Sequence, residues 1–434
     1  MSGAKDPGAL LRASYAAALA AADPAQMLAR HLPPPPAGKT IVVGAGKAAA
    51  SMAAAVERAY GALAPERLSG LVVTRYGHGL PTQRIRVVEA GHPVPDAAGA
   101  QAAQDILDLA RSAGPQDRLL ALISGGGSSL LSLPVPSVPV ADLQATTREL
   151  LRCGAPIGDM NVVRKHLSQV QGGRLAAAAA QSGAEVLALI VSDVTGDRPS
   201  DIGSGPCTPD PSTYADALAV LARWGAKVPE SVSAHLQAGA RGEIAETPKP
   251  GDAAFARVQN KVIATARGSL LAGAECFCAE GVRPVILGDT VTGEARDVAS
   301  TYAALVREIR EHGEPFATPV ALISGGECTV TIPAGKSGRG GRCSEFLLSL
   351  ALELDGMDGV HAIAADTDGI DGSEDNAGAI LDPRTVARAA SAGWPARKAL
   401  DDHDAWGFFD AAGGLVSTGP TLTNVNDYRA ILIL

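Results

Sequence analysis

The strongest chemical signal in the sequence is a glycine-rich segment, SGGGSS, at positions 124–129. Three successive glycines follow an apolar run, so their backbone N–H groups can point at an anion, and the flanking serines add hydroxyl donors. The pattern predicts a phosphate-binding loop, and a flexible turn without a ligand is the alternative. The residues of this predicted loop are Ser124, Gly125, Gly126, Gly127, Ser128 and Ser129.

A second glycine-rich segment, GAGK at 44–47, also lies between an apolar run and a helix-like stretch. Gly44, Gly46 and Ala49 match G-x-G-x-x-A, the loose form of the dinucleotide fingerprint, but the next apolar run ends in Arg75 where an acidic ribose partner is expected. A lysine at a helix start is unfavourable unless an anion lies beside it. Lys47 is therefore a candidate phosphate ligand, and a solvated lysine near a tight turn is the alternative.

Two familiar active-site signatures are missing. Gly335-Lys336-Ser337 lacks the glycine that a P-loop needs five residues earlier, where Val330 stands. The hydrolase elbow G-x-S-x-G does not occur either. Any nucleotide site in this chain is therefore not of the P-loop type, and covalent hydrolysis by a serine elbow is not supported.

Aspartates follow two further apolar runs, in SDVTGD at 192–197 and DTDGIDG at 366–372. Asp193, Asp366, Asp368 and Asp371 could bind Mg²⁺, which favours one or two carboxylates together with phosphate oxygens and water. Aspartates in such loops also cap helices and turns. Both readings stay open for each of these residues.

Basic residues gather in two places, NVVRKHLS at 161–168 and GKSGRGGR at 335–342. Their guanidinium and ammonium groups suit a phosphate or a carboxylate, and a solvated helix face or surface loop is the alternative in each case. His92, in GHPVPD, either contacts a substrate or braces its turn. The basic side chains of the two segments are Arg164, Lys165, His166, Lys336, Arg339 and Arg342.

These polar loops need a framework that brings them together, and the chain supplies one. Short apolar runs, each followed by a Gly- or Asp-rich loop and a helix-like segment, recur along the sequence, for example at 40–43, 119–123 and 186–191. Such alternation predicts a parallel sheet covered by helices on both faces. Ligands of these sheets bind outside the carboxyl ends of the strands, where the loops lie.

The two halves of the chain echo each other, because ALISGG occurs at 121–126 and again at 321–326. A polar stretch rich in Pro and Gly at 240–255 separates them. We expect an α/β protein of two domains, residues 1–245 and 255–434, with mostly parallel, helix-covered, Rossmann-like sheets facing across a cleft.

Composition narrows the class of protein. The net charge is −9, aromatic residues make up 3%, and no block of Lys or Arg occurs, so nucleic acid is not an expected partner. No stretch reaches the ~20 apolar residues of a membrane span, and the N-terminal segment reads as an amphipathic helix. The six cysteines show no zinc-like spacing. We expect a cytoplasmic protein, monomeric or homodimeric, that acts on small molecules.

Taken together, the motifs resemble those of the glycerate 2-kinases whose C-terminal half is called the MOFRL domain. The matching segments run in order along almost the whole chain: VVGAGKAA, GHPVPD, LISGGGSSLL, NVVRKHLSQVQGGRLA, SDVTGDRPSDIGSGPCTPD, ISGGECTVTI, GRGGRCSEFLLSLAL, AADTDGIDGSEDNAGA and GPTLTNVNDYR. The resemblance implies phosphorylation of the 2-hydroxyl of D-glycerate by ATP, with Mg²⁺, in a cleft between two α/β domains.

The resemblance implies that Lys47, Arg342 and the loop 124–129 act in catalysis and phosphate binding, and the motifs themselves suggest the other roles. Lys47 and Arg342 are the expected catalytic cations, and Asp193 is a candidate for metal binding or for guiding the hydroxyl proton. Expected nucleotide or phosphate contacts are Gly44, Gly46, the loop 124–129 and Lys165. Expected substrate contacts are His92, Arg339 and Glu345, and expected metal ligands are Asp193, Asp366 and Asp368.

The alternative is an NAD(P)H-dependent hydroxypyruvate reductase, a label that members of this family also carry. Arg75 in place of the acidic ribose partner would favour NADPH over NADH. Lys47 inside the fingerprint, the second glycine-rich loop and the aspartates at strand ends favour the kinase instead.

Overall fold

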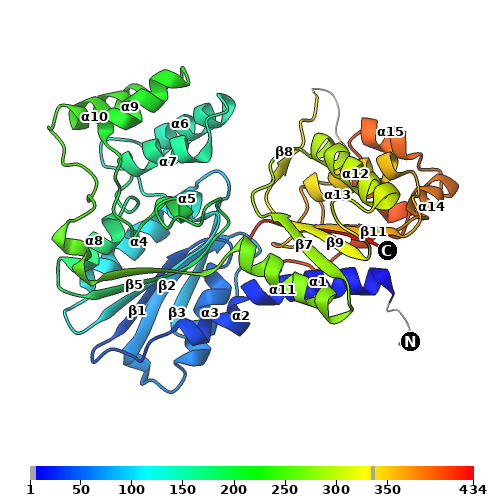
Figure 1. Ribbon diagram of the computed structural model, residues 1–434. Coiled ribbons are helices and arrows are strands. Elements are labelled where there is room, and N and C mark those ends of the chain that lie inside the picture. Colours follow the sequence, from blue (N-terminus) through cyan, green and yellow to red (C-terminus); the bar gives the residue numbers. More distant parts are fainter. Residues whose placement is uncertain (1–5, 334–337) are drawn as a thin grey trace. The chain divides into compact units, whose positions relative to one another are not determined.

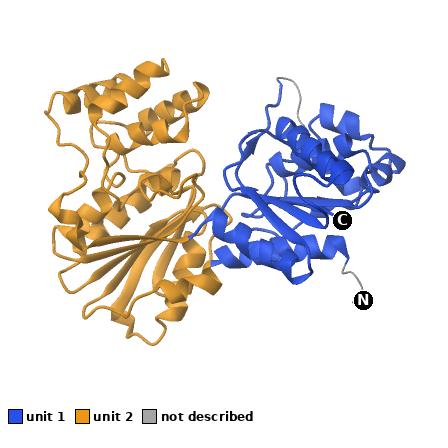
Figure 2. Ribbon diagram, viewed as in Figure 1, with its two compact units in different colours: residues 1–23, 264–434 blue, residues 24–263 orange. Residues whose placement is uncertain are grey.

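The computed structural model describes residues 6–333 and 338–434, which form two compact units (Figure 2). Unit 2 is Pro24–Ile263, and unit 1 combines Ala264–Leu434 with the N-terminal segment up to Asp23. The predicted division, 1–245 and 255–434, placed that N-terminal segment in the first domain. It packs on unit 1 instead, because α1 (Pro7–Ala22) buries Leu11 and Tyr15 in a core shared with Phe277 and Tyr428.

Unit 2 is built on a six-stranded sheet with the order β3-β2-β1-β4-β5-β6 (Figure 1). The pairs β1–β2, β1–β4, β2–β3 and β4–β5 are parallel, as the alternating pattern predicts. Every residue of β1 and β4 is buried, since helices cover both faces. The strands are β1 (Thr40–Ala45), β2 (Leu68–Arg75), β3 (Ile85–Ala90), β4 (Arg118–Ile123), β5 (Glu185–Val191) and β6 (Val258–Ala264).

The helices of unit 2 form the covering layers and a separate extension. Helices α4 and α8 lie on one face of the sheet and α3 on the other, whereas α6, α7, α9 and α10 pack around a core of their own that includes Met160, Val163 and Tyr214 (Figure 1). The helices are α2 (Pro24–Met27), α3 (Ala49–Ala59), α4 (Ala97–Ser112), α5 (Gly127–Leu130), α6 (Val140–Arg152), α7 (Ile157–His166), α8 (Arg174–Ala180), α9 (Tyr214–Arg223) and α10 (Glu230–Ala240), with 3-10 turns at Leu28–His31, Pro65–Arg67, Ile202–Ser204 and Ala253–Arg257.

The sheet of unit 1 corrects the expectation of mostly parallel pairing. Its order is β13-β12-β11-β14-β9-β7, and only β7–β9 is parallel among its pairs in the described chain. Strands buried on both faces read as continuous apolar runs whichever way they pair, so the sequence pattern carries no direction. The strands of unit 1 are β7 (Arg283–Gly288), β8 (Gly293–Glu294), β9 (Val320–Ser324), β10 (Cys328–Thr329), β11 (Val360–Asp366), β12 (Gly378–Leu381), β13 (Leu415–Val416) and β14 (Asp427–Ile433).

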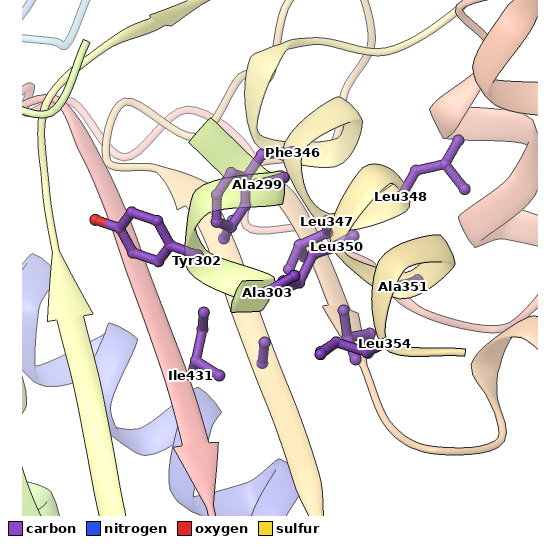
Figure 3. Close-up of a cluster of buried hydrophobic side chains, with 14 of the residues drawn as sticks. Ala299, Tyr302, Ala303, Phe346, Leu347, Leu348, Leu350, Ala351, Leu354 and Ile431 are labelled. Atoms are coloured by element: carbon purple, nitrogen blue, oxygen red, sulfur yellow. The ribbon is translucent and has the colours of Figure 1, made fainter. Parts of the chain in front are cut away.

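Two cores sandwich this second sheet. Helices α1 and α11 cover one face, and α12 and α13 cover the other, where Tyr302, Phe346 and Ile431 belong to one apolar cluster (Figure 3). No helix of the described chain is long and apolar enough to cross a membrane. The remaining helices of unit 1 are α11 (Ala266–Ala279), α12 (Ala295–His312), α13 (Arg342–Leu354), α14 (Thr385–Ser391), α15 (Ala396–Asp401) and α16 (Ala405–Ala411).

Candidate functional site

The order of the strands in unit 2 places the two glycine-rich segments beside each other. The chain leaves β1 toward β2 on one side, and β4 lies on its other side, so the strand order reverses between β1 and β4. A crevice outside the carboxyl ends of the strands is expected at such a switch point. Ala45 is level with Ile123 in the parallel pairing. The segment GAGK at 44–47 spans the end of β1, and SGGGSS begins directly after Ile123.

Hydrogen bonds tie these two loops together. The Lys47 N–H donates to the Gly125 carbonyl at 2.8 Å, and the Ala48 N–H donates to Ser124 Oγ at 3.0 Å. Gly46 has φ of +135°, and a side chain there would clash with Ser124. The glycine of the fingerprint is thus required by the close approach of the second loop. The predicted residues Gly44, Gly46, Ser124 and Gly125 lie together.

The loop 124–129 presents backbone donors at this edge of the sheet. Gly126 has φ of +80°, a left-handed conformation that favours glycine, and α5 begins at the next residue. The N–H groups of Gly125, Gly126 and Ser128 make no hydrogen bond to any residue that the structure describes. Three unpaired amides in a turn of this kind form a suitable nest for an anion. The geometry supports the predicted phosphate-binding loop.

Lys47 and His92 reach the same loop from two other strands. A methyl group built on Gly126 would lie 2.9 Å from His92 Nε2 and 3.5 Å from Lys47 Cγ. Lys47 follows β1, and His92 follows β3. The structure therefore brings together the predicted catalytic lysine, the predicted substrate-binding histidine and the glycine-rich loop.

Asp193 lies on the segment after β5, next to β4 at the same edge of the sheet. This segment also carries Ser204, whose Oγ donates to Asn161 Oδ1 and shares a 2.9 Å hydrogen bond with Ser128 Oγ. Ser204 has a positive φ of 58°, an uncommon conformation for a non-glycine residue that is often found at functional sites. Neither Ser204 nor Asn161 was predicted as a site residue from the sequence.

The basic segment on α7 divides its charges between two environments. Lys165 is buried, and its Nζ lies 3.5 Å from Asp210 Oδ1 in the interior of unit 2. Its predicted phosphate contact therefore competes with an internal ion pair. Arg164, the preceding residue, lines a cavity with Ser128 and Ser129 instead. Neighbouring helix residues do not share a face. Which of these two cations faces the glycine-rich loop therefore depends on how α7 is rotated about its axis, and the basic motif alone does not specify that rotation.

In unit 1, Arg342 begins α13 and is surrounded by carboxylates. Its Nε donates to Asp427 Oδ1 at 2.9 Å, and its Nη2 donates to Glu327 Oε1 at 2.9 Å and to Asp366 Oδ2 at 2.7 Å. Burial lowers the pKa of Arg342, but Asp427, Asp366 and Glu327 outweigh it and raise the pKa above its ordinary value. Three carboxylates share this guanidinium, and Asp427 also pairs with Arg429 at 2.5 Å.

The predicted metal ligands in unit 1 are engaged with the chain. Asp366 Oδ1 accepts from the Asp368 N–H at 2.9 Å, and Asp368 Oδ1 accepts from the Ile370 N–H at 3.0 Å. Asp371 caps α13, since it accepts from the N–H groups of Cys343 and Ser344. Across residues 6–333 and 338–434, no group of three or more His, Cys, Asp or Glu side chains is arranged to hold a metal ion.

The two other predicted substrate contacts in unit 1 face different surroundings. Arg339 pairs with Glu374 at 2.7 Å and stacks over the Trp406 ring, with its guanidinium carbon 3.6 Å from the ring centroid. Glu345 is buried and accepts from Arg296 Nε at 2.6 Å. The carboxylate of Glu345 thus belongs to an internal ion pair, and its contact with a substrate stays a prediction. Lys336 lies outside the described residues.

Comparisons with known proteins match one family model in each half of the chain. Residues 10–237 match the family described as "Domain of unknown function (DUF4147)", and residues 320–427 match the MOFRL family. The chain is 49% identical to a putative hydroxypyruvate reductase of Agrobacterium vitis, with 98% of this chain and 94% of that protein covered. It is 41% identical to a glycerate 2-kinase of Pyrococcus horikoshii, with 90% of this chain and 86% of that protein covered.

A solved structure extends the similarity to three dimensions. The crystal structure of a glycerate kinase from Thermotoga maritima superimposes with a TM-score of 0.86 at 36% identity. The alignment covers 98% of this chain and 99% of that one. Both units therefore have counterparts in one known protein.

Proposed function

Because this chain belongs to the family of glycerate 2-kinases that carry a MOFRL domain, we propose that it transfers a phosphoryl group from ATP to the 2-hydroxyl of D-glycerate, giving 2-phosphoglycerate and ADP. The observation that carries the proposal is the loop 124–129, with three unpaired amides at the switch point of a parallel sheet and Lys47 beside it. Backbone amides and a lysine are the groups that phosphate binding requires.

Phosphoryl transfer needs positioning and neutralisation of charge more than covalent participation by the protein. In the proposed reaction the amides of Gly125, Gly126 and Ser128 hold phosphate oxygens, and Lys47 neutralises the charge that develops on the phosphoryl group. His92, whose Nε2 lies against Gly126, is a substrate contact on the same side of the loop. Asp193 accepts the hydroxyl proton or takes part in metal binding.

Arg342 is the second cation of the proposal. Its three carboxylate partners hold its guanidinium in place, but they also compete with any anion for its N–H groups. Mg²⁺ fits the donors at this end of β11, because it needs only one or two carboxylates and takes its other ligands from phosphate and water. Asp366 and Asp368 would hold it, and when bound it supplies charge neutralisation to the phosphates.

The reductase alternative has one observation in its favour, the name of the Agrobacterium vitis relative. The switch point of unit 2 is also where a dinucleotide would bind in such a sheet. β2 ends in Arg75 and not in the acidic residue that binds the ribose of NAD. The fold is compatible with both the kinase and the reductase activity, so an enzymatic assay must distinguish them.

The test is a pair of coupled assays on the purified protein. With D-glycerate, ATP and Mg²⁺, we expect ADP to form at a rate that depends on glycerate, and we expect no oxidation of NADPH by hydroxypyruvate. NADPH oxidation without ADP formation would replace the kinase with the reductase. A cytoplasmic location and a monomeric or homodimeric state are further parts of the proposal, measured by fractionation and by light scattering.

A further inference from the structure

A narrow cavity lies beside the glycine-rich loop of unit 2. Its volume is about 10 Å³, which admits about one water molecule or one small polar group. Side chains from the loop, from α6 and from α7 line it. The polar residues of the lining are Ser128, Ser129, Ser132, Thr147, Arg164, Ser168 and Gln171.

Arg164 is the charged residue of this lining, and no acidic side chain accompanies it there. Its guanidinium makes no hydrogen bond or ion pair with the described part of the chain. Burial lowers the pKa of Arg164 to about 10. A charge withdrawn from water without a partner costs free energy, so the protein gains nothing in stability from leaving this arginine unpaired. An anionic ligand would supply the missing partner.

The position of Arg164 is set by neighbours that belong to the candidate site. Asn161 lies one helical turn before Arg164 on α7, so the two side chains share a face. Asn161 Oδ1 accepts from Ser204 Oγ, and Ser204 is hydrogen-bonded to Ser128 of the glycine-rich loop. This face of α7 is therefore attached to the loop, whereas Lys165 points to Asp210 in the interior.

Further hydroxyl donors complete the cavity. Ser168 Oγ accepts from the N–H groups of Val170 and Gln171, which leaves its own proton to donate. The Ser132 hydroxyl makes no hydrogen bond within the described residues. The cavity thus offers a guanidinium fork and two hydroxyls, all of them donors.

We propose that this cavity is the carboxylate subsite of the enzyme and that Arg164 binds the carboxylate of glycerate. The proposal rests on the proposed kinase function, which supplies the substrate. A carboxylate fits better than a phosphate because it carries one negative charge against one cation, and Arg binds it bidentately. The unpaired amides of the loop 124–129 already serve the phosphate.

The subsite also accounts for the choice of hydroxyl. In glycerate the 2-hydroxyl is on the carbon next to the carboxylate, and the 3-hydroxyl is one carbon further away. Ser128 and Ser129 belong both to the cavity and to the phosphate-binding loop. A carboxylate held by Arg164 keeps the 2-hydroxyl nearer to that loop, so Arg164 contributes to the position of phosphorylation.

The experiment compares wild-type protein with Arg164→Met, Arg164→Lys and the control Arg148→Met. The control removes an exposed arginine of α6 whose side chain makes no hydrogen bond or ion pair within the described residues. Direct binding of D-glycerate is measured by calorimetry, and the KM values for glycerate and for ATP are measured separately. Two charge-assisted hydrogen bonds at about 1.5 kcal/mol each correspond to an affinity loss of about 100-fold. We expect that loss for glycerate in Arg164→Met, a smaller loss in Arg164→Lys, and an unchanged KM for ATP.

Different outcomes test the proposed kinase function and the carboxylate subsite separately. Wild-type protein that neither binds nor phosphorylates D-glycerate contradicts the proposed function. Wild-type activity together with a glycerate affinity in Arg164→Met within 3-fold of the control contradicts the carboxylate subsite alone. A loss confined to ATP binding would assign Arg164 to the nucleotide. If Arg164→Met does not fold, the comparison of Arg164→Lys with Arg148→Met decides, and added guanidinium ion should restore glycerate turnover in Arg164→Ala.

Discussion

Replacing Gly126 with alanine tests the tight contact between the glycine-rich loop and the two residues beside it. The new methyl group would lie 2.9 Å from His92 Nε2, closer than normal van der Waals contact, and 3.5 Å from Lys47 Cγ. The φ of +80° adds about 1–2 kcal/mol of backbone strain for a residue with a side chain. His92 or the loop must therefore move by a few tenths of an ångström.

Gly154→Ala is the matched control. Gly154 has φ of +73°, and a methyl group built on it would meet no atom within 4 Å. Both variants should lose about 1–2 kcal/mol of stability, or about 2–8 °C in Tm for a unit of this size. Only Gly126→Ala should lose activity, by about 3- to 10-fold in kcat/KM for glycerate, because displacement of an aligned group by about 1 Å costs ~10²-fold and the shift here is a few tenths of an ångström.

The assay is ADP release at saturating ATP with glycerate varied, accompanied by thermal unfolding of each variant. If Gly126→Ala and Gly154→Ala lose stability equally and both keep wild-type kcat/KM, the loop, His92 and Lys47 do not form one site. Our reading of this edge of the sheet would then be refuted.

Four further predictions concern Lys47, Lys165, Asp210 and the metal ion. Lys47→Met should lower kcat by about 10²–10³-fold with an unchanged Tm, and a rate within 3-fold of wild type would remove Lys47 from the mechanism. Lys165→Met should cost about 3–5 kcal/mol of unfolding free energy, because it removes the lysine that pairs with the buried carboxylate of Asp210, while kcat per folded molecule stays unchanged. A normal Tm with lost activity would instead support phosphate binding by Lys165. Although burial raises the pKa of Asp210, Lys165 and Ser212 hold that pKa below its ordinary value. The stabilisation from ionised Asp210 is therefore present above pH ~3.9 and is lost as the pH falls through the folded-state pKa. Acid unfolding should be less steep in Asp210→Asn. Chelation of Mg²⁺ should abolish ADP release without changing Tm, because the described chain holds no preformed cluster of three metal-binding side chains; a drop in Tm on chelation would indicate a structural metal.

The meeting of the two glycine-rich loops was predictable from the sequence. Parallel strands that alternate with helices bring the segments after their carboxyl ends to one edge, and Lys47, His92 and the loop 124–129 follow three such strands. The helix-covered parallel sheet of unit 2 was predicted for the same reason. The close contact of Gly46 with Ser124 explains why a glycine stands at that position of the fingerprint.

Other features depend on information that local patterns do not carry. The direction of pairing in unit 1 is one example, because buried strands show the same apolar pattern in parallel and antiparallel sheets. The central strand β14 is also hard to recognise, since it includes the buried ion pair of Asp427 and Arg429 and does not read as a continuous apolar run. The placement of α1 on unit 1 is another, since an amphipathic helix does not specify which core covers it. Lys165 and not Arg164 was predicted to contact phosphate, because only the rotation of α7 about its axis determines which of the two side chains faces the loop. Asp371 looked like a metal ligand, and its capping of α13 became visible only in three dimensions.

The central claim is that this chain phosphorylates the 2-hydroxyl of D-glycerate. The most direct measurement is ³¹P NMR of the product formed from D-glycerate, ATP and Mg²⁺ by the wild-type protein, with Lys47→Met as the control. We expect the phosphomonoester signal of 2-phosphoglycerate, absent in the control. A signal of 3-phosphoglycerate, or no glycerate-dependent phosphomonoester at all, would contradict it.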